Sequence, residues 1–152
     1  MVLPFFRDDG TVDLGMTHKE AKRIAERGVT GLVLMGSNGP ILSHHTRRIL
    51  LCSLCYYFDF YGYKEVQLMS MGCGGTSVRD TLQFIYEAKE FFADFALGLP
   101  PVHLEFDAHA SDIEDFYTRI AWQSKLPIVV YKFLGVTDLT AIRLFRIPAL
   151  LK

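Results

Sequence analysis

Several residues whose side chains are suited to chemistry follow short apolar runs in this 152-residue sequence. Gly36-Ser37-Asn38-Gly39 comes directly after the apolar run 31–35 and offers a hydroxyl, a carboxamide and backbone N–H groups. Such a set of neutral donors is suited to holding a small anion, for example a carboxylate. A tight turn with Asn-Gly chemistry and no ligand is the other interpretation, and from the turn alone it is the more common outcome.

Two more candidate groups stand after apolar runs. His103 follows Pro100-Pro101, and a histidine there can transfer protons near neutral pH. Lys132 follows the run 127–131, and a lysine at such a place can have a lowered pKa and form a Schiff base. An ordinary exposed lysine is the more common outcome. The remaining histidines have no second ligand at metal spacing, so we expect no metal site.

A second glycine-rich turn, residues 72–77 (GCGGTS), is a candidate phosphate cradle. It does not match G-x-G-x-x-G, because Ser77 stands where the third glycine would be, and it lacks the lysine of a P-loop. Close backbone packing beside a helix cap explains these glycines at least as well. The sequence therefore gives little support for a nucleotide site.

Composition excludes several classes of protein. The net charge is −1, with 16 basic and 17 acidic residues and no basic stripe, so we expect no nucleic-acid partner. The longest apolar region, residues 49–60, is shorter than the ~20 residues of a membrane helix, so we expect no membrane association. The chain length suits one domain, 1–152. The mean hydropathy of +0.20 is high for a small monomer, which indicates apolar surface covered by a partner or a core that is partly missing.

The three cysteines, Cys52, Cys55 and Cys73, do not form a disulfide framework. Their odd number predicts a reducing compartment, and we expect the cytoplasm. Cys52 and Cys55 have C-x-x-C spacing, but they lie inside an apolar helical run. That context favours two small core side chains over a redox or metal site.

Helical and strand patterns alternate along the chain. Strands are predicted at 31–35, 65–71, 94–99 and 127–131, and helices at 17–27, 43–57, 77–92, 111–124 and 138–145. Thr17, Ser43, Ser77 and Ser111 are predicted N-caps. The repeat of about 30 residues is the size of a βα unit and predicts a parallel sheet covered by helices. An open doubly wound sheet and part of a (β/α)8 barrel both fit, and both place function at the carboxyl ends of the strands.

The motifs, in their order, resemble the dihydrodipicolinate synthase / N-acetylneuraminate lyase family, which includes 4-hydroxy-2-oxoglutarate aldolase. They are LPFFRDDGTVD, GVTGLVLMGSNG, LSHHTR, MGCGGTSVRDTLQFIYEAKEFFADFALGLPP and LPIVVYKFLGVTDL. The GSNG form of the turn is more like the hydroxyoxoglutarate aldolase branch than the GTTGE form of the synthase branch. The resemblance implies a partial (β/α)8 barrel, an α/β fold with about the first five βα units and without the C-terminal strands.

The resemblance also implies a class I lyase, in which a lysine forms a Schiff base with pyruvate or a related 2-oxo acid and no cofactor takes part. By this resemblance Ser37, Asn38 and Gly39 bind the substrate carboxylate, and Tyr131 corresponds to the tyrosine of the family's Tyr-Asn pair. His103 stands where the family has its proton-relay tyrosine.

The sequence departs from the family pattern at functional positions. Pro40 replaces the usual glutamate after the turn, and His103 replaces the relay tyrosine. The family's Schiff-base lysine lies on the sixth strand, beyond the last residue of this sequence, which leaves Lys132 as a candidate replacement. We therefore expect an impaired lyase. The alternatives are a non-catalytic protein that binds a small carboxylate or pairs with a full-length homologue, a homo-oligomer that completes the barrel, and a flavodoxin-like sheet that binds a phosphorylated ligand.

Overall fold

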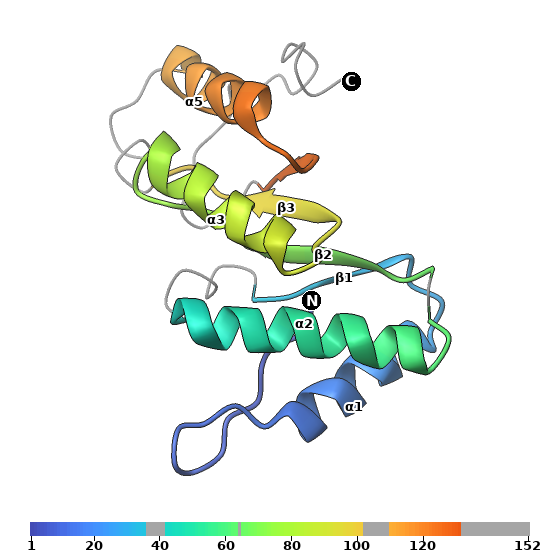
Figure 1. Ribbon diagram of the computed structural model, residues 1–152. Helices are drawn as coiled ribbons and strands as arrows, with labels where there is room; N and C mark the ends of the chain where they lie inside the picture. The colour runs from blue at the N-terminus through green and yellow to red at the C-terminus, as the bar shows by residue number, and fades with distance from the viewer. Residues whose placement is uncertain (36–41, 64, 102–109, 132–152) are drawn as a thin grey trace.

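A computed structural model describes residues 1–35, 42–63, 65–101 and 110–131 of the chain. Helices and strands alternate through these residues (Figure 1). In chain order they are α1 (Leu14–Ala25), β1 (Gly31–Val33), α2 (His44–Phe60), β2 (Gln67–Gly72), α3 (Val78–Glu90), β3 (Phe95–Gly98), α5 (Ala110–Gln123) and β4 (Ile128–Val130). The helix predicted at 138–145 lies outside the described residues.

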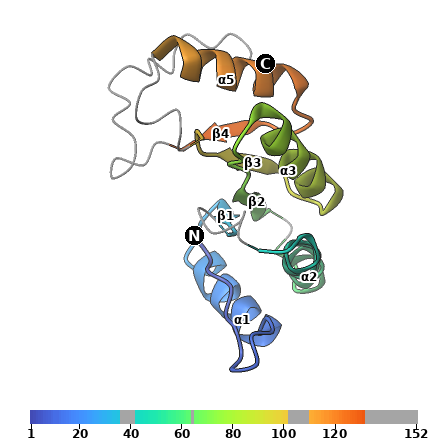
Figure 2. The same ribbon diagram turned by 90° about the vertical axis from the view of Figure 1, so that its left-hand side faces the viewer.

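The strands form one parallel sheet in the order β1-β2-β3-β4, which is their order along the chain. Because parallel crossovers are almost always right-handed, an unreversed order places the connecting helices on the same face of the sheet. Figure 2 shows this arrangement, with α1, α2, α3 and α5 in an arc around the outside of the curved sheet. An open doubly wound sheet needs a reversal of strand order and helices on both faces. The described residues therefore form part of a (β/α)8 barrel, and the doubly wound alternative is wrong for them.

The amino end of the chain lies beside β1. Val2 forms a parallel bridge with Leu34, and its N–H donates to the carbonyl of Val33 at 2.7 Å. Val2 is fully buried. Val2 thus extends the sheet on the side of β1 away from β2.

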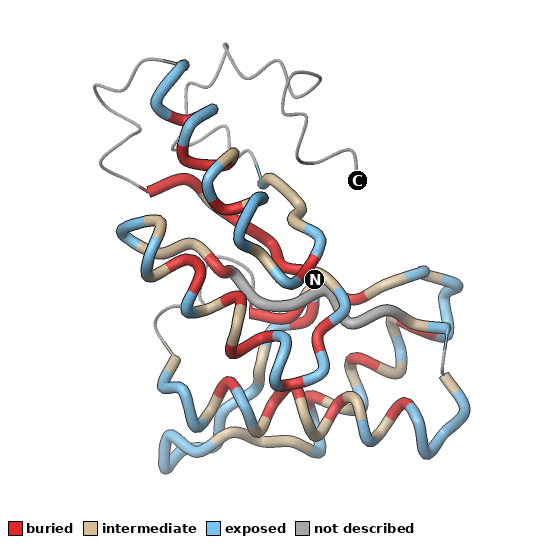
Figure 3. The backbone as a smooth tube through the Cα atoms, turned by 45° about the horizontal axis from the view of Figure 1, so that its top comes forward, coloured by how far each residue is buried: buried red, intermediate tan, exposed pale blue. Residues whose placement is uncertain are grey.

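The two faces of the sheet differ in what they pack against. One face packs into the hydrophobic core under the helices, and the side chains that it contributes include Leu32, Leu34, Ala96, Ile128 and Val130. Figure 3 marks buried residues in red along β3 and at intervals along the helices. Leu97 is buried but does not belong to this core. Since side chains alternate along a strand, Leu97 and its register partner Val129 point to the opposite face, which is the interior face of a barrel.

Serine caps fix the beginnings of two helices. The Ser43 side chain accepts from the N–H of Thr46 at the start of α2, and the Ser77 side chain accepts from the N–H of Asp80 at the start of α3. Each bond satisfies one of the free N–H groups of a first helical turn. Both predicted caps are confirmed.

Two other predicted caps are wrong. The first helix begins at Leu14, because Asp13 accepts from the N–H of Met16, while the hydroxyl of Thr17 donates to the carbonyl of Asp13. Thr17 is fully buried, so its side chain ties the helix to the preceding loop instead of capping it. Helix α5 begins at Ala110, and Ser111 therefore lies inside its first turn.

A strained residue follows helix α3 and its C-cap. Phe92 has a φ of +66°, and its side chain is 64% exposed. The left-handed conformation costs a residue other than glycine about 1–2 kcal/mol, and glycine is the usual residue at this position after a helix. We expect Phe92→Gly to raise the free energy of unfolding by up to about 1 kcal/mol, since the added freedom of the unfolded chain offsets part of the gain. Urea denaturation measures the change.

The control for this substitution lies in the same helix. Lys89 is exposed and has helical backbone, so Lys89→Gly should lower the free energy of unfolding by about 1 kcal/mol. Equal destabilisation by both substitutions would contradict the strain at Phe92.

Candidate functional site

The carboxyl edge of the sheet brings together segments that are far apart in the sequence. The N–H of Cys73, just after β2, donates to the carbonyl of Leu97 in β3 at 2.7 Å. The N–H of Tyr131, just after β4, donates to the carbonyl of Gly98 at 2.9 Å. The hydroxyl of Tyr117 in α5 also donates to Gly98, at 3.1 Å. These bonds hold the ends of β2, β3 and β4 side by side at the edge where barrel enzymes place their active sites.

The end of β1 has an unusual backbone. Met35 has a φ of +55° and is almost fully buried. It is the last described residue before the predicted carboxylate-binding turn. A large side chain in the left-handed region carries strain that the surrounding structure must hold, and strain of this kind gathers at functional sites. The backbone at the end of β1 is therefore strained directly before the segment in which the sequence places its anion-binding groups.

Tyr131 is the one predicted site residue that lies within the described part of the chain. Its amide continues the hydrogen-bond ladder between β3 and β4, so the alternation of the strand extends to it. It then shares a face with Val129, opposite to Ile128 and Val130, which pack under the helices. This alternation directs Tyr131 to the interior face, and its side chain is 37% exposed at the carboxyl edge.

The other predicted site residues lie outside the described residues. They are Ser37, Asn38, Gly39, His103 and Lys132. The structure describes the strand ends that precede these segments.

Close packing explains the glycines of the turn after β2. A Cβ atom on Gly75 would lie 2.7 Å from both the Cβ of Asp80 and the N atom of Thr81. A Cβ on Gly74 would lie 3.1 Å from the Cβ of Leu99. The N–H of Gly75 already donates to the Thr81 hydroxyl at 3.0 Å. These contacts agree with the packing interpretation of the turn and leave no need for a phosphate to account for its glycines.

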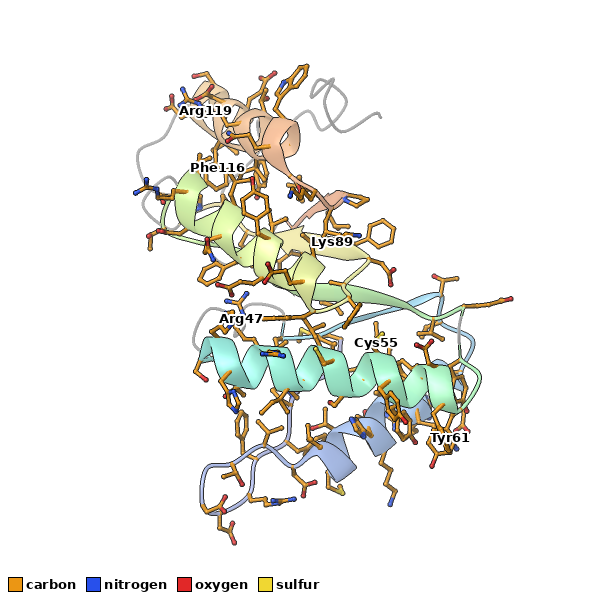
Figure 4. All side chains as sticks on the ribbon, in the orientation of Figure 1. Arg47, Cys55, Tyr61, Lys89, Phe116 and Arg119 are labelled. Carbon is orange, nitrogen blue, oxygen red and sulfur yellow. The ribbon has the colours of Figure 1, made fainter. Side chains whose placement is uncertain are left out.

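Sequence reasoning missed a buried charge beside this edge. Arg47, in the first turns of α2, is only 1% exposed, and its Nη2 lies 3.9 Å from Oε2 of Glu87 in α3. Its guanidinium also stacks on the ring of Phe84 at 4.2 Å from the centroid. Burial lowers the pKa of Arg47, while Cys73 and Glu87 act in the opposite direction. Figure 4 shows Arg47 in the gap between α2 and α3.

The described residues leave the hydrogen bonding of this cluster incomplete. Among the described residues, Nε and Nη2 of Arg47 and Oε2 of Glu87 have no hydrogen-bond partner, although Nδ1 of His44 approaches Oε2 to 3.2 Å. Glu87 does accept from Gln83 through Oε1, at 3.2 Å. The helical spacing of the sequence could have revealed this burial, because it places Arg47 on the same buried face of α2 as Leu50, Leu51 and Leu54.

Two kinds of feature are absent from the described residues. No group of three or more His, Cys, Asp or Glu side chains there is arranged to hold a metal ion. Within the same residues, no helix is both long and apolar enough to cross a bilayer.

Curated relatives of the chain include proteins named as aldolases. A probable mitochondrial 4-hydroxy-2-oxoglutarate aldolase of Emericella nidulans is 27% identical over 135 residues, which cover 88% of this chain and 43% of the relative. L-threo-3-deoxy-hexylosonate aldolase of Hypocrea jecorina is 31% identical over 137 residues, with the same coverage. The chain thus spans less than half the length of these relatives. No family profile matches it.

Solved structures agree with these relatives. A putative dihydrodipicolinate synthase family protein from Coccidioides immitis has a TM-score of 0.73 at 29% identity, covering 90% of this chain and 43% of that one. YagE of Escherichia coli K12, solved in complex with pyruvate, also has a TM-score of 0.73, at 24% identity over 90% of this chain and 44% of its own.

The fold and the strand ends define a part of a (β/α)8 barrel whose carboxyl edge is the candidate site. The comparisons confirm the resemblance to the dihydrodipicolinate synthase family, including its 4-hydroxy-2-oxoglutarate aldolase members, over about nine-tenths of this chain. The cytoplasmic location remains a prediction, and the Emericella nidulans relative is named as mitochondrial.

Proposed function

We propose that residues 1–152 form one incomplete barrel domain that binds a 2-oxo acid such as pyruvate at the carboxyl edge of its sheet. In this proposal Ser37, Asn38 and the N–H of Gly39 hold the substrate carboxylate. The observation that carries it is the left-handed turn of the backbone at Met35, directly before these residues, at the edge to which β2, β3 and β4 also converge.

The chemistry of the relatives supports the choice of ligand. The curated relatives named above are aldolases, and YagE, which binds pyruvate in its solved structure, is 26% identical over 99% of this chain. A hydroxyl, a carboxamide and backbone N–H groups suit a carboxylate because they donate hydrogen bonds without adding a charge. Tyr131, directed to the interior face, is then placed to contact the bound acid.

The reaction that we propose is that of an impaired class I lyase. Lys132 is the candidate for the amine that condenses with the substrate ketone, releasing water and forming a Schiff base. His103 is the candidate for the proton transfers that accompany this step. Successive side chains of β4 point to opposite faces of the sheet, so an unbroken strand would direct Lys132 to the face opposite Tyr131. The proposal therefore requires that the regular strand does not continue to Lys132.

Trapping with borohydride tests the proposal. Folded protein is incubated with pyruvate and sodium borohydride, and intact mass spectrometry followed by peptide mapping locates any reduced adduct. We expect a single adduct, on Lys132, that forms more slowly than in a full-length relative. Lys132→Met should abolish it, and Lys125→Met, which changes an exposed lysine before β4, should leave it unchanged.

The same experiment separates the two parts of the proposal. A folded protein that forms no adduct would contradict the lyase chemistry. Pyruvate binding measured by calorimetry on that protein would then decide whether it still holds a carboxylate. Binding that Asn38→Ala does not weaken would contradict the assignment of the carboxylate site.

A further inference from the structure

The outer face of α2 carries a stripe of residues that the barrel core does not use. The stripe is defined here as His45, Ile49, Tyr56 and Phe60. Tyr56 is 73% exposed and Phe60 is 72% exposed, His45 is exposed and Ile49 is half-buried. Exposed aromatic side chains gathered on one helix face are a common sign of an interaction surface.

The other faces of α2 are occupied. The buried residues Leu50, Leu51, Leu54 and Phe58 face the sheet. On the side towards α1, His18 lies 3.1 Å from the Ser53 hydroxyl and stacks on Tyr57 with ring centroids 4.7 Å apart. On the side towards α3, His44 and Arg47 approach Glu87. Figure 4 shows α2 between α1 and α3, with Cys55 on the α3 side and Tyr61 at the end near α1.

The spacing of the stripe is the same when read from either end. Its residues are separated by four, seven and four positions. A second α2 that runs antiparallel, related by a two-fold axis between residues 52 and 53, therefore presents Tyr56 to Ile49 and Phe60 to His45. Such a self-complementary pairing is the geometry that an isologous interface requires.

The charges beside the stripe fit the same pairing. Arg48 and Asp59 are both exposed and lie eleven residues apart, about three helical turns, so they lie along one flank of the stripe. In the antiparallel pair, Arg48 of one copy falls about two residues, or roughly 3 Å along the axis, from the position opposite Asp59 of the other. An arginine side chain spans this offset, so the pairing joins opposite charges on both sides of the two-fold axis.

We propose that two copies of this chain associate through the outer faces of their α2 helices, with the stripe at the centre and Arg48–Asp59 ion pairs beside it. The proposal does not depend on the lyase chemistry. Helix α2 has 17 residues and is about 25 Å long, so the interface is a modest one and the dimer is concentration-dependent.

Sedimentation velocity over a range of protein concentrations tests the proposal. We expect the wild-type chain to shift from monomer to dimer as the concentration rises. Tyr56→Glu should weaken the dimer at least about thirtyfold, because it places a charge at the centre of an apolar contact. Trp122→Glu is the matched control, since Trp122 is 68% exposed on α5, away from α2, and this change should leave the dimer intact.

Charge reversal identifies the partner as a second copy. Arg48→Glu and Asp59→Arg should each weaken the dimer about fivefold or more, since two-fold symmetry makes every substitution count twice. The double variant should restore the wild-type affinity to within about threefold. Circular dichroism on each variant confirms that the helices remain folded. A monomer at every concentration, a dimer unaffected by Tyr56→Glu, or a double variant weaker than both single ones would overturn the proposal.

Discussion

Replacing Glu87 by glutamine is expected to lower the free energy of unfolding by about 3–5 kcal/mol, the usual cost of removing one partner from a buried ion pair. Arg47 is 1% exposed, and Glu87 is the nearby carboxylate that offsets its charge. Glutamine keeps the size of the side chain and removes only the charge. The large effect comes from the buried guanidinium that is left behind, more than from the strength of the original pair.

Urea denaturation measures this change, and Glu90→Gln on the exposed side of the same helix is the control. That control should alter the free energy of unfolding by no more than about 0.5 kcal/mol. The double variant Arg47→Met/Glu87→Gln should cost much less than Glu87→Gln alone, because it removes both members of the buried pair and leaves no uncompensated charge. Equally small effects of Glu87→Gln and Glu90→Gln would show that Glu87 does not compensate the buried charge of Arg47.

Gly75→Ala is expected to destabilise the protein by about 1–3 kcal/mol, the usual cost of overpacking a closely packed site. The added methyl group would lie 2.7 Å from the Thr81 N atom, which belongs to the backbone of α3 and cannot rotate away. The turn and the helix must therefore separate, and this movement weakens the bond between the Gly75 N–H and the Thr81 hydroxyl.

The matched control is Gly15→Ala. Its Cβ meets only the Oδ1 atom of Asp13, at 3.4 Å, and the residue lies within α1. Alanine favours the helix there, so we expect this variant to be as stable as the wild type or up to about 1 kcal/mol more stable. Thermal unfolding of both variants gives the comparison. Equal stability of Gly75→Ala and Gly15→Ala would show that the turn after β2 has room that the structure does not suggest.

The sequence predicted the βα repeat and the place of each described strand because both depend on local patterns. Ser43 and Ser77 are followed at once by helical periodicity, and both cap their helices. Thr17 has the same local signature, but the tertiary contact between its hydroxyl and the N–H of Phe5, twelve residues earlier, buries it and leaves the cap to Asp13. A pattern confined to one segment cannot reveal such a contact.

At the candidate site, too, the local features were predictable from the sequence and the tertiary contacts were not. The strand ends that carry it were predictable, since parallel strands of one sheet end at one edge. The face to which Tyr131 belongs was open in the sequence and followed only from the packing of Ile128 and Val130 under the helices. The pairing of Arg47 with Glu87 was not predictable, because it joins two helices through side chains that ordinarily lie at the surface.

The order of the strands has a consequence for how the chain acquires its structure. Each strand pairs with the next one along the chain, and the paired residues are 25 to 36 positions apart in sequence. Every closing loop is therefore of similar, moderate length, so the entropy lost at each step is similar as well. During synthesis on the ribosome, each new βα unit is made after the strand with which it pairs. Folding can thus proceed from the amino end by successive additions, in which each new strand pairs with the exposed edge of the strand before it.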